Sequence, residues 1–257
     1  MKKIISFILI LSLTLLWGCN NQNDTTADLA NVQSAVDRTN SENPLSGEYV
    51  LEITFGDGAV LYYAKGDILW DRENFQAYGS FDQTYLGASA KLENYYSNGT
   101  MISVESGNAV EAQRTPDDVF SKFPYFKLPA AEEEVIKGTN TLGDSYKFTI
   151  DNTENLSRLV IGDDIYSLVT VLKKPQKDKT EYSQAQCIYT VKDDKVVSAK
   201  YEFDVKLFDT PAYNPNYSQP ESEYTLTIHV SAKVSYDFSQ ENIVIPQYSD
   251  ESSENSK

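Results

Sequence analysis

The sequence predicts an α+β fold built on one long, curved antiparallel β-sheet, with a few short helices covering one of its faces. The longest segments, 196–208 and 223–236, alternate strictly between apolar and polar residues, which is typical of strands that bury one face only. Such strands are much longer than the usual five or six residues and must twist and curl. Helical spacing of apolar residues is confined to a few short segments.

The first 18 residues have the pattern of a secretory signal peptide. Lys2 and Lys3 precede an apolar run over 4–17, which is shorter than the roughly 20 residues that span a membrane. Residues 16–19, "LWGC", resemble a bacterial lipobox, in which the signal is cut before a cysteine whose thiol carries acyl groups; Trp17 replaces the usual small residue. We expect lipidation of Cys19 and anchoring on the extracytoplasmic face of the cell membrane. The alternative is an ordinary secreted protein.

Composition divides the remaining chain into a tether, one domain and a tail. Residues 19–44 are polar and lack aromatic side chains, which favours a tether, and apolar residues at helical spacing predict a short helix over about 26–38 within it. Residues 45–247 contain no linker and predict a single β-rich domain. Residues 248–257 have the composition of a disordered tail.

The domain begins with a meander. The segment "GEYVLEITF", residues 47–55, turns at 56–58 into "AVLYYAK", and a second turn is predicted at 65–67 before "ILW". Further strands are expected around 74–82, 84–96 and 100–110, with a tight turn at Asn98 and Gly99 between the last two.

Three short helices are predicted near the middle of the chain. Thr115 and Pro116 predict the start of the first, which Pro124 ends. The second is predicted over 129–138 and the third over 163–175, where β-branched residues leave a strand open as the alternative.

Cys187 and His229 are assigned to structural positions by the alternation of their strands. Cys187 lies on the apolar face of 184–191, and a lipidated Cys19 leaves it without a disulfide partner, so we expect a buried free thiol. His229, the only histidine, falls on the polar face of 223–236. A surface position argues against catalysis, and one histidine cannot build a histidine-based metal site.

Charge and motifs argue against several functions. The net charge of −16 opposes binding to nucleic acid and to anionic lipid. The sequence contains no serine-hydrolase elbow, phosphate-binding glycine loop or zinc motif, so we expect neither an enzyme nor a cofactor. The paired acidic residues fall in predicted turns or helix starts, where solvation and capping explain them. Calcium binding there is a minor hypothesis.

The order of lipobox, tether with a helix, strand meander, short helices and long paired strands resembles the bacterial LolA/LolB/LppX-like lipoproteins, including uncharacterised Gram-positive members. The resemblance covers most of residues 25–246. It implies a half-barrel whose concave face, partly closed by helices, holds a lipid or acyl chain. The residues that it implies as ligand contacts are Tyr49, Leu51, Ile53, Phe55, Tyr62, Trp70, Tyr201, Phe203, Tyr224, Leu226 and Ile228. Plain core packing is the alternative for each of them.

Two functions therefore compete. The first is a membrane-anchored carrier of an apolar ligand. The second is a cell-surface interaction or structural module with an envelope protein as its partner, which the 18 tyrosines and the loop at 209–224 favour. A carrier needs an apolar cavity of several hundred Å³, whereas an interaction module has a filled core.

Overall fold

The computed structural model describes residues 25–122, 128–131, 135–162, 165–169, 175–209, 224–239 and 243–249. The predicted signal peptide, Cys19 and residues 250–257 lie outside the described residues. Within the described part, no helix combines the length and the apolarity that crossing a membrane would require.

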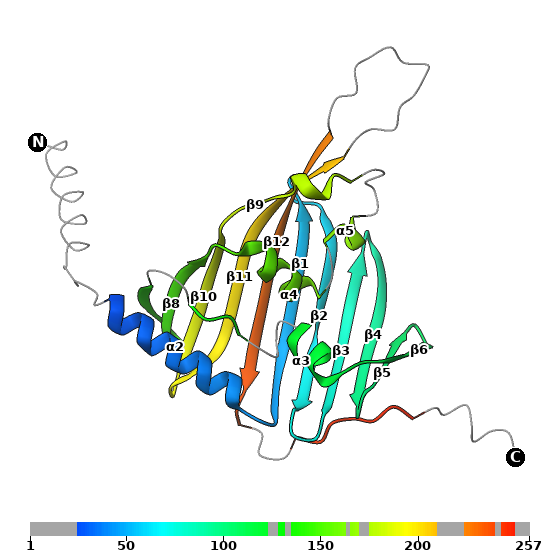
Figure 1. Cartoon of the computed structure of the whole chain (residues 1–257), viewed down its shortest axis with the longest axis horizontal. Helices are drawn as coiled ribbons and strands as arrows, with labels where there is room; N and C mark the ends of the chain where they lie inside the picture. The colour runs from blue at the N-terminus through cyan, green and yellow to red at the C-terminus, as the bar shows by residue number, and fades with distance from the viewer. Residues whose placement is uncertain are drawn as a thin grey trace, which may run out of the picture.

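The fold is a 12-stranded open sheet in which every pairing of neighbours is antiparallel. The strands are β1 (Leu45–Phe55), β2 (Val60–Asp71), β3 (Gln76–Tyr85), β4 (Ala88–Ser97), β5 (Thr100–Glu105), β6 (Asn108–Gln113), β7 (Ile136–Asn140), β8 (Gly143–Ile150), β9 (Glu181–Tyr182), β10 (Ala185–Lys192), β11 (Lys195–Asp209) and β12 (Tyr224–Asp237). Their order is β6-β5-β4-β3-β2-β1-β12-β11-β10-β8-β7, with β9 paired to β11. The sheet curves without closing (Figure 1).

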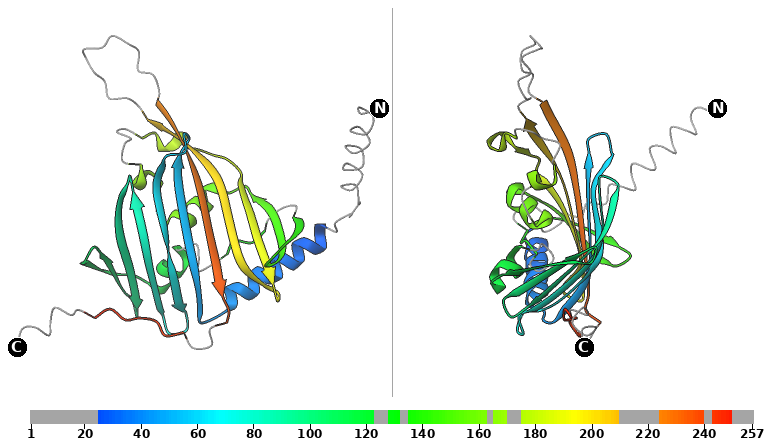
Figure 2. Two further views of the ribbon diagram at one scale, coloured as in Figure 1. Left: turned by 180° about the vertical axis from the view of Figure 1, so that it is seen from behind. Right: turned by 90° about the vertical axis from the view of Figure 1, so that its right-hand side faces the viewer.

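The helices lie on the concave face of the sheet, as the side view in Figure 2 shows. They are α2 (Thr25–Ser41), α3 (Pro116–Lys122), α4 (Thr153–Ile161) and α5 (Ile165–Leu168), and a 3₁₀ turn, η1, follows at Lys177–Lys179. The predicted fold class, a long curved antiparallel sheet with short helices over its concave face, is therefore confirmed.

Alternation along the long strands decides which side chains are buried. In β11 the buried apolar residues on the helical side are Val196, Ala199, Tyr201, Phe203, Val205 and Leu207, whereas Val197, Lys200 and Glu202 are only partly buried. Cys187 is fully buried and is not part of a disulfide, as predicted. His229 lies on the opposite face, where it pairs with Asp204 at 2.9 Å.

Helix α2 is part of the folded domain. It contacts β11 and β10 and crosses in front of them (Figure 1), and its Val32, Ala35 and Val36 are buried in the main core. The predicted helix is confirmed and is longer than expected. The assignment of residues 19–44 to a tether is wrong from residue 25 onward, because the chain there packs on the sheet. An apolar face with helical spacing provides the burial that docks it.

The turn predicted at 65–67 is wrong, because β2 runs straight through it. A Cβ atom at Gly66 would lie 1.9 Å from the carbonyl oxygen of Ser80. Gly66 therefore permits a close approach of β2 and β3 within the sheet and does not mark a turn.

Two predicted strands differ from those observed. The stretch 84–96 is interrupted by a turn at Leu86 and Gly87, and 100–110 by a turn at Ser106 and Gly107. All four residues have positive φ, from 47° to 84°, which a tight hairpin turn requires. The turn predicted at Asn98 and Gly99 is confirmed by φ angles of 48° and 93°.

The helices predicted over 129–138 and 163–175 are largely wrong. Residues 136–138 belong to β7, and 128–131 have no regular structure. In the second segment only Ile165–Leu168 is helical among the described residues, and Pro175 forms a β-bridge with Asp209. Sheet pairing at the edges has overridden the local pattern. Strand β8 and helix α4 occupy residues for which no element was predicted.

Candidate functional site

The concave face divides into two halves, and large side chains fill one of them. The filled half consists of β8, β10, β11 and β12. Its buried aromatic residues pack edge to face, with 4.8 Å between the ring centroids of Phe148 and Tyr189. The Tyr189 hydroxyl donates to the carbonyl of Pro129 at 2.8 Å and lies 3.0 Å from the Tyr201 hydroxyl. Among the described residues, these rings are part of the buried core.

Small side chains leave space on the other half. The hollow half consists of β1 to β4, where Ala64 pairs with Gln83, and Gln83 pairs with Ala90 on the next strand. Tyr85 pairs with Ala88. Alanine fills less of the space between the sheet and its helical cover than the tyrosines of the filled half. Cavities therefore form here.

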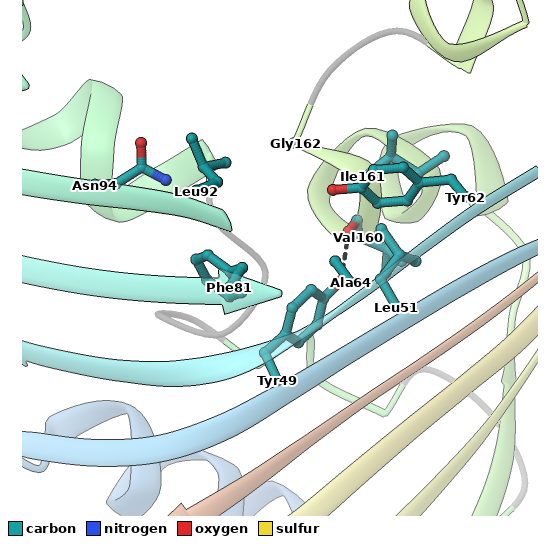
Figure 3. Close-up of a pocket in the computed structure, with 10 residues that line it drawn as sticks. All are labelled: Tyr49, Leu51, Tyr62, Ala64, Phe81, Leu92, Asn94, Val160, Ile161 and Gly162. Atoms are coloured by element: carbon teal, nitrogen blue, oxygen red, sulfur yellow. Dashed lines mark hydrogen bonds between the residues drawn. The ribbon is translucent and has the colours of Figure 1, made fainter. Parts of the chain in front are cut away.

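The smaller pocket, of about 130 Å³, lies between the sheet and the end of α4. Its lining comes from β1 to β4 and from α4, as Figure 3 shows. The lining residues are Tyr49, Leu51, Tyr62, Ala64, Phe81, Leu92, Asn94, Val160, Ile161 and Gly162. Tyr49 donates its hydroxyl hydrogen to the carbonyl of Val160, which fixes α4 above the pocket.

The larger pocket, of about 410 Å³, lies against α5 and shares Tyr62 with the smaller one. The lining residues are Tyr62, Gln83, Tyr85, Ala88, Ser89, Ala90, Glu105, Ser167 and Leu168. Tyr85 donates to the carbonyl of Leu168 at 2.8 Å. Each pocket thus has a floor of strand residues and a helical wall held by a tyrosine hydroxyl.

A short chain of hydrogen bonds crosses the polar end of the larger pocket. The Tyr62 hydroxyl donates to Gln83 Oε1 at 3.1 Å, and Gln83 Nε2 donates to Glu105 Oε1 at 2.9 Å. Burial raises the pKa of Tyr62, and the negative charge of Glu105 raises it further. The two outer groups therefore fix the orientation of the Gln83 amide.

The structure places three of the eleven predicted contacts at these pockets, namely Tyr49, Leu51 and Tyr62. Core packing occupies most of the others. Ile53, Trp70, Tyr201, Phe203 and Ile228 are at most 2% exposed, and Phe55 and Leu226 are partly buried and pack against the core. The side chain of Tyr224 lies outside the described residues. Trp70 packs edge to face against Tyr236, with 6.1 Å between the ring centroids, and lines neither pocket.

Sequence reasoning missed most of the pocket lining. The strands that carry Phe81, Leu92 and the alanines at 64, 88 and 90 were predicted without assigning which face is buried. Small residues that alternate along these strands were the sequence signal for a cavity. Helix α4 also had a signal, because Asn152 caps its start and Gly162, with φ 77°, ends it.

A third pocket, of about 330 Å³, lies beside α4 and α5 and is polar. Arg158 forms an ion pair with Glu154 at 2.6 Å there, and the Tyr166 hydroxyl lies 2.6 Å from Thr180 Oγ1. Among the described residues, no group of three or more His, Cys, Asp or Glu side chains is placed to hold a metal ion.

No protein-family model matches the sequence, and no curated protein matches it.

Several solved structures have a similar course of the chain. The lipoprotein LppX of Mycobacterium tuberculosis is 10% identical, with a TM-score of 0.46, and the match covers 86% of this chain and 99% of LppX. LprF of Mycobacterium bovis is 11% identical, with a TM-score of 0.42, over 86% of this chain and 97% of LprF. A LolA superfamily protein of Nitrosomonas europaea is 8% identical, with a TM-score of 0.27, over 80% of this chain and 91% of that protein. The curved open antiparallel sheet with short helices on its concave face agrees with the fold that the predicted resemblance implies.

Proposed function

We propose that this protein is a lipid-anchored, extracytoplasmic lipoprotein that carries an apolar ligand, a lipid or an acyl chain, on the hollow half of its sheet. The observation that carries the proposal is the pair of pockets that share Tyr62 beneath α4 and α5. The larger one falls within the roughly 300–1,000 Å³ typical of ligand sites. Their lining is mainly apolar, with a few hydrogen-bonding groups, which is the composition that binds an amphiphile.

The anchor is proposed at Cys19, in the cell envelope. A diacylated thiol supplies the two chains that stable anchoring needs. Only residues 20–24 separate this cysteine from the start of α2, so the anchor would hold the domain close to the membrane surface, where the pockets would exchange ligand with the membrane or an envelope partner.

Carrier function is favoured over catalysis by the positions of the reactive groups. Cys187 is buried in the filled half, and His229 with Asp204 lies on the convex face. Neither residue lines the two pockets, so the cysteine and the histidine of the described chain do not meet at the space for a ligand.

The test compares ligand binding by the purified full chain and by a variant with a filled pocket. Monododecanoylglycerol is titrated by calorimetry and by native mass spectrometry. We expect saturable, micromolar binding, since burying a chain yields roughly 0.8 kcal/mol per methylene before association costs. Ala90→Phe should weaken it about tenfold or more, because the ring occupies the space of several methylenes.

The matched control is Ala109→Phe, an exposed alanine on edge strand β6, on the face away from the pockets. It should bind like the unmodified chain. Saturable binding that both variants retain equally would place the ligand elsewhere. Absence of any binding by the folded chain would favour the interaction module.

A further inference from the structure

One charged side chain stands at the polar end of the larger pocket. Glu105 ends β5 and pairs with Leu92, which lines the neighbouring pocket. Among the residues that line the larger pocket, it is the only one that carries a charge at neutral pH. A ligand with its chain in this pocket therefore brings its head group close to a carboxylate.

Within the described part of the chain, no lysine or arginine forms an ion pair with Glu105. Gln83 donates its amide hydrogen to it, which positions the charge without neutralising it. The field of Glu105 also reaches Tyr62, since it adds to burial in raising the pKa of that phenol. The net charge of the chain, −16, is also negative and adds to the repulsion of an anionic ligand.

The size of the site limits the ligand as well. The larger pocket, at about 410 Å³, lies at the lower end of the roughly 300–1,000 Å³ range of ligand sites, and the smaller pocket adds about 130 Å³. This space suits one acyl chain better than the two chains of a membrane phospholipid.

We propose that Glu105 determines head-group specificity, so that the site takes single-chain amphiphiles with a neutral or cationic head and discriminates against anionic ones such as fatty acids. The inference rests on the proposed carrier function and adds the class of ligand. The carboxylate repels an anionic head, accepts a hydrogen bond from a hydroxyl head and attracts a cationic head.

The test uses three amphiphiles with the same chain length: monododecanoylglycerol, dodecanoate and dodecyltrimethylammonium. Each is titrated against the full chain by calorimetry, at low ionic strength and at a mildly alkaline pH where the carboxylate of the ligand is charged. We expect dodecanoate to bind about fivefold or more weakly than the neutral ester, as for one partly exposed charge pair. Added salt should reduce this difference.

Glu105→Gln should raise the affinity for dodecanoate about fivefold and should narrow the difference in affinity between dodecanoate and the neutral ester, because the anionic head then meets no like charge. The matched control is Glu52→Gln, which changes the net charge equally but lies on an exposed position between the buried Leu51 and Ile53, on the opposite face of β1. It should change neither affinity. Melting temperatures of both variants confirm that they are folded.

The outcomes separate the two proposals. If the neutral ester binds but Glu105→Gln alters dodecanoate binding no more than Glu52→Gln does, the specificity proposal is overturned and the carrier function stands. If dodecanoate binds as tightly as the ester to the unmodified chain, the specificity proposal also fails. If none of the three amphiphiles binds, both proposals are overturned.

Discussion

Tyrosine hydroxyls connect the concave face of the sheet to the segments that cover it. Tyr49, Tyr85 and Tyr189 each lie on a strand and donate the hydroxyl hydrogen to a main-chain carbonyl of the covering segments. Tyr49 and Tyr189 are buried, and Tyr85 is partly buried. A buried carbonyl without a partner costs about 1–3 kcal/mol. These tyrosines therefore provide hydrogen-bond donors for carbonyls of the covering segments and hold those segments against the sheet.

Tyr189 has a single hydroxyl hydrogen, so its hydrogen bond to Pro129 fixes the direction of its hydrogen bond with Tyr201. Because Tyr189 donates to Pro129, Tyr201 must be the donor in the pair at 3.0 Å. Tyr189→Phe leaves both the Pro129 carbonyl and the Tyr201 hydroxyl without that partner, so we expect a loss of about 2–3 kcal/mol in unfolding free energy. Tyr201→Phe removes a donor only and should cost about 0.5–1.5 kcal/mol.

Urea unfolding near neutral pH measures both variants. Burial raises the pKa of both phenols well above 10.0, so the folded state favours the protonated form. The stability that this provides is fully present below pH 10 and is lost as the pH rises through the folded-state pKa values. Equal costs for the two variants near neutral pH would contradict the assigned direction.

At the scale of elements, α2 shows that the folded unit begins well before its first strand. Val36 is 2% exposed and belongs to the core, whereas its neighbour Asp37 is exposed. The backbone amide of Val196 in β11 also donates to Thr39 Oγ1 at 2.8 Å. The helix thus contributes both apolar burial and a hydrogen-bond acceptor to the domain.

We predict that Val36→Ala lowers the unfolding free energy by about 1–3 kcal/mol, since it leaves a cavity under α2. Asp37→Ala, one residue away on the exposed side, should change it by less than about 0.5 kcal/mol. Thermal or urea unfolding checks both. If the two substitutions have equally small effects, α2 behaves as a tether, as its composition suggested.

Elements with strict alternation could be predicted from the sequence, and elements defined by pairing could not. The long segments 196–208 and 223–236 carry enough period-two signal to assign both their type and their buried face. Edge strand β7 is exposed along its whole length, so its sequence lacks that signal and looked helical. Gly66 shows the same limit, because glycine serves turns and close strand contacts equally well.

The site was predicted less well because the prediction rested on large apolar side chains, whereas a cavity forms where side chains are small. Tyr201 and Phe203 have the pattern of a ligand surface, yet they fill their half of the sheet. Ala64 and Ala90 leave the space for the pockets on the hollow half of the sheet. Whether a stripe of apolar residues is covered depends on the packing of helices far away in the sequence, which local periodicity does not contain.

At the scale of the whole molecule, the proposed anchor sets where the pockets work. We predict that Cys19→Ala abolishes incorporation of labelled palmitate and releases the chain from membrane association that depends on the lipid. Stable anchoring takes two acyl chains, and a net charge of −16 provides no electrostatic substitute on anionic lipid.

Fractionation of cells and fatty-acid labelling measure this directly. Cys187→Ala, a buried cysteine in the domain, is the matched control and should label as the unmodified chain does. Labelling that persists in Cys19→Ala would show that the lipobox interpretation is wrong.

The place of β12 has a consequence for the order in which the sheet is assembled. Strands β1 to β6 pair in sequence order, β7 to β11 form a second group, and β12 lies between β1 and β11 to join the two. When the chain emerges from its N-terminus, these two groups of strands form separately. Strands β1 and β11 then each have one unpaired edge until β12, which begins at residue 224, emerges. Completion of the sheet waits for the last strand, because contacts this distant in sequence form late. Before β12 is complete, the chain therefore passes through a stage in which chaperones that cover exposed apolar surface matter most.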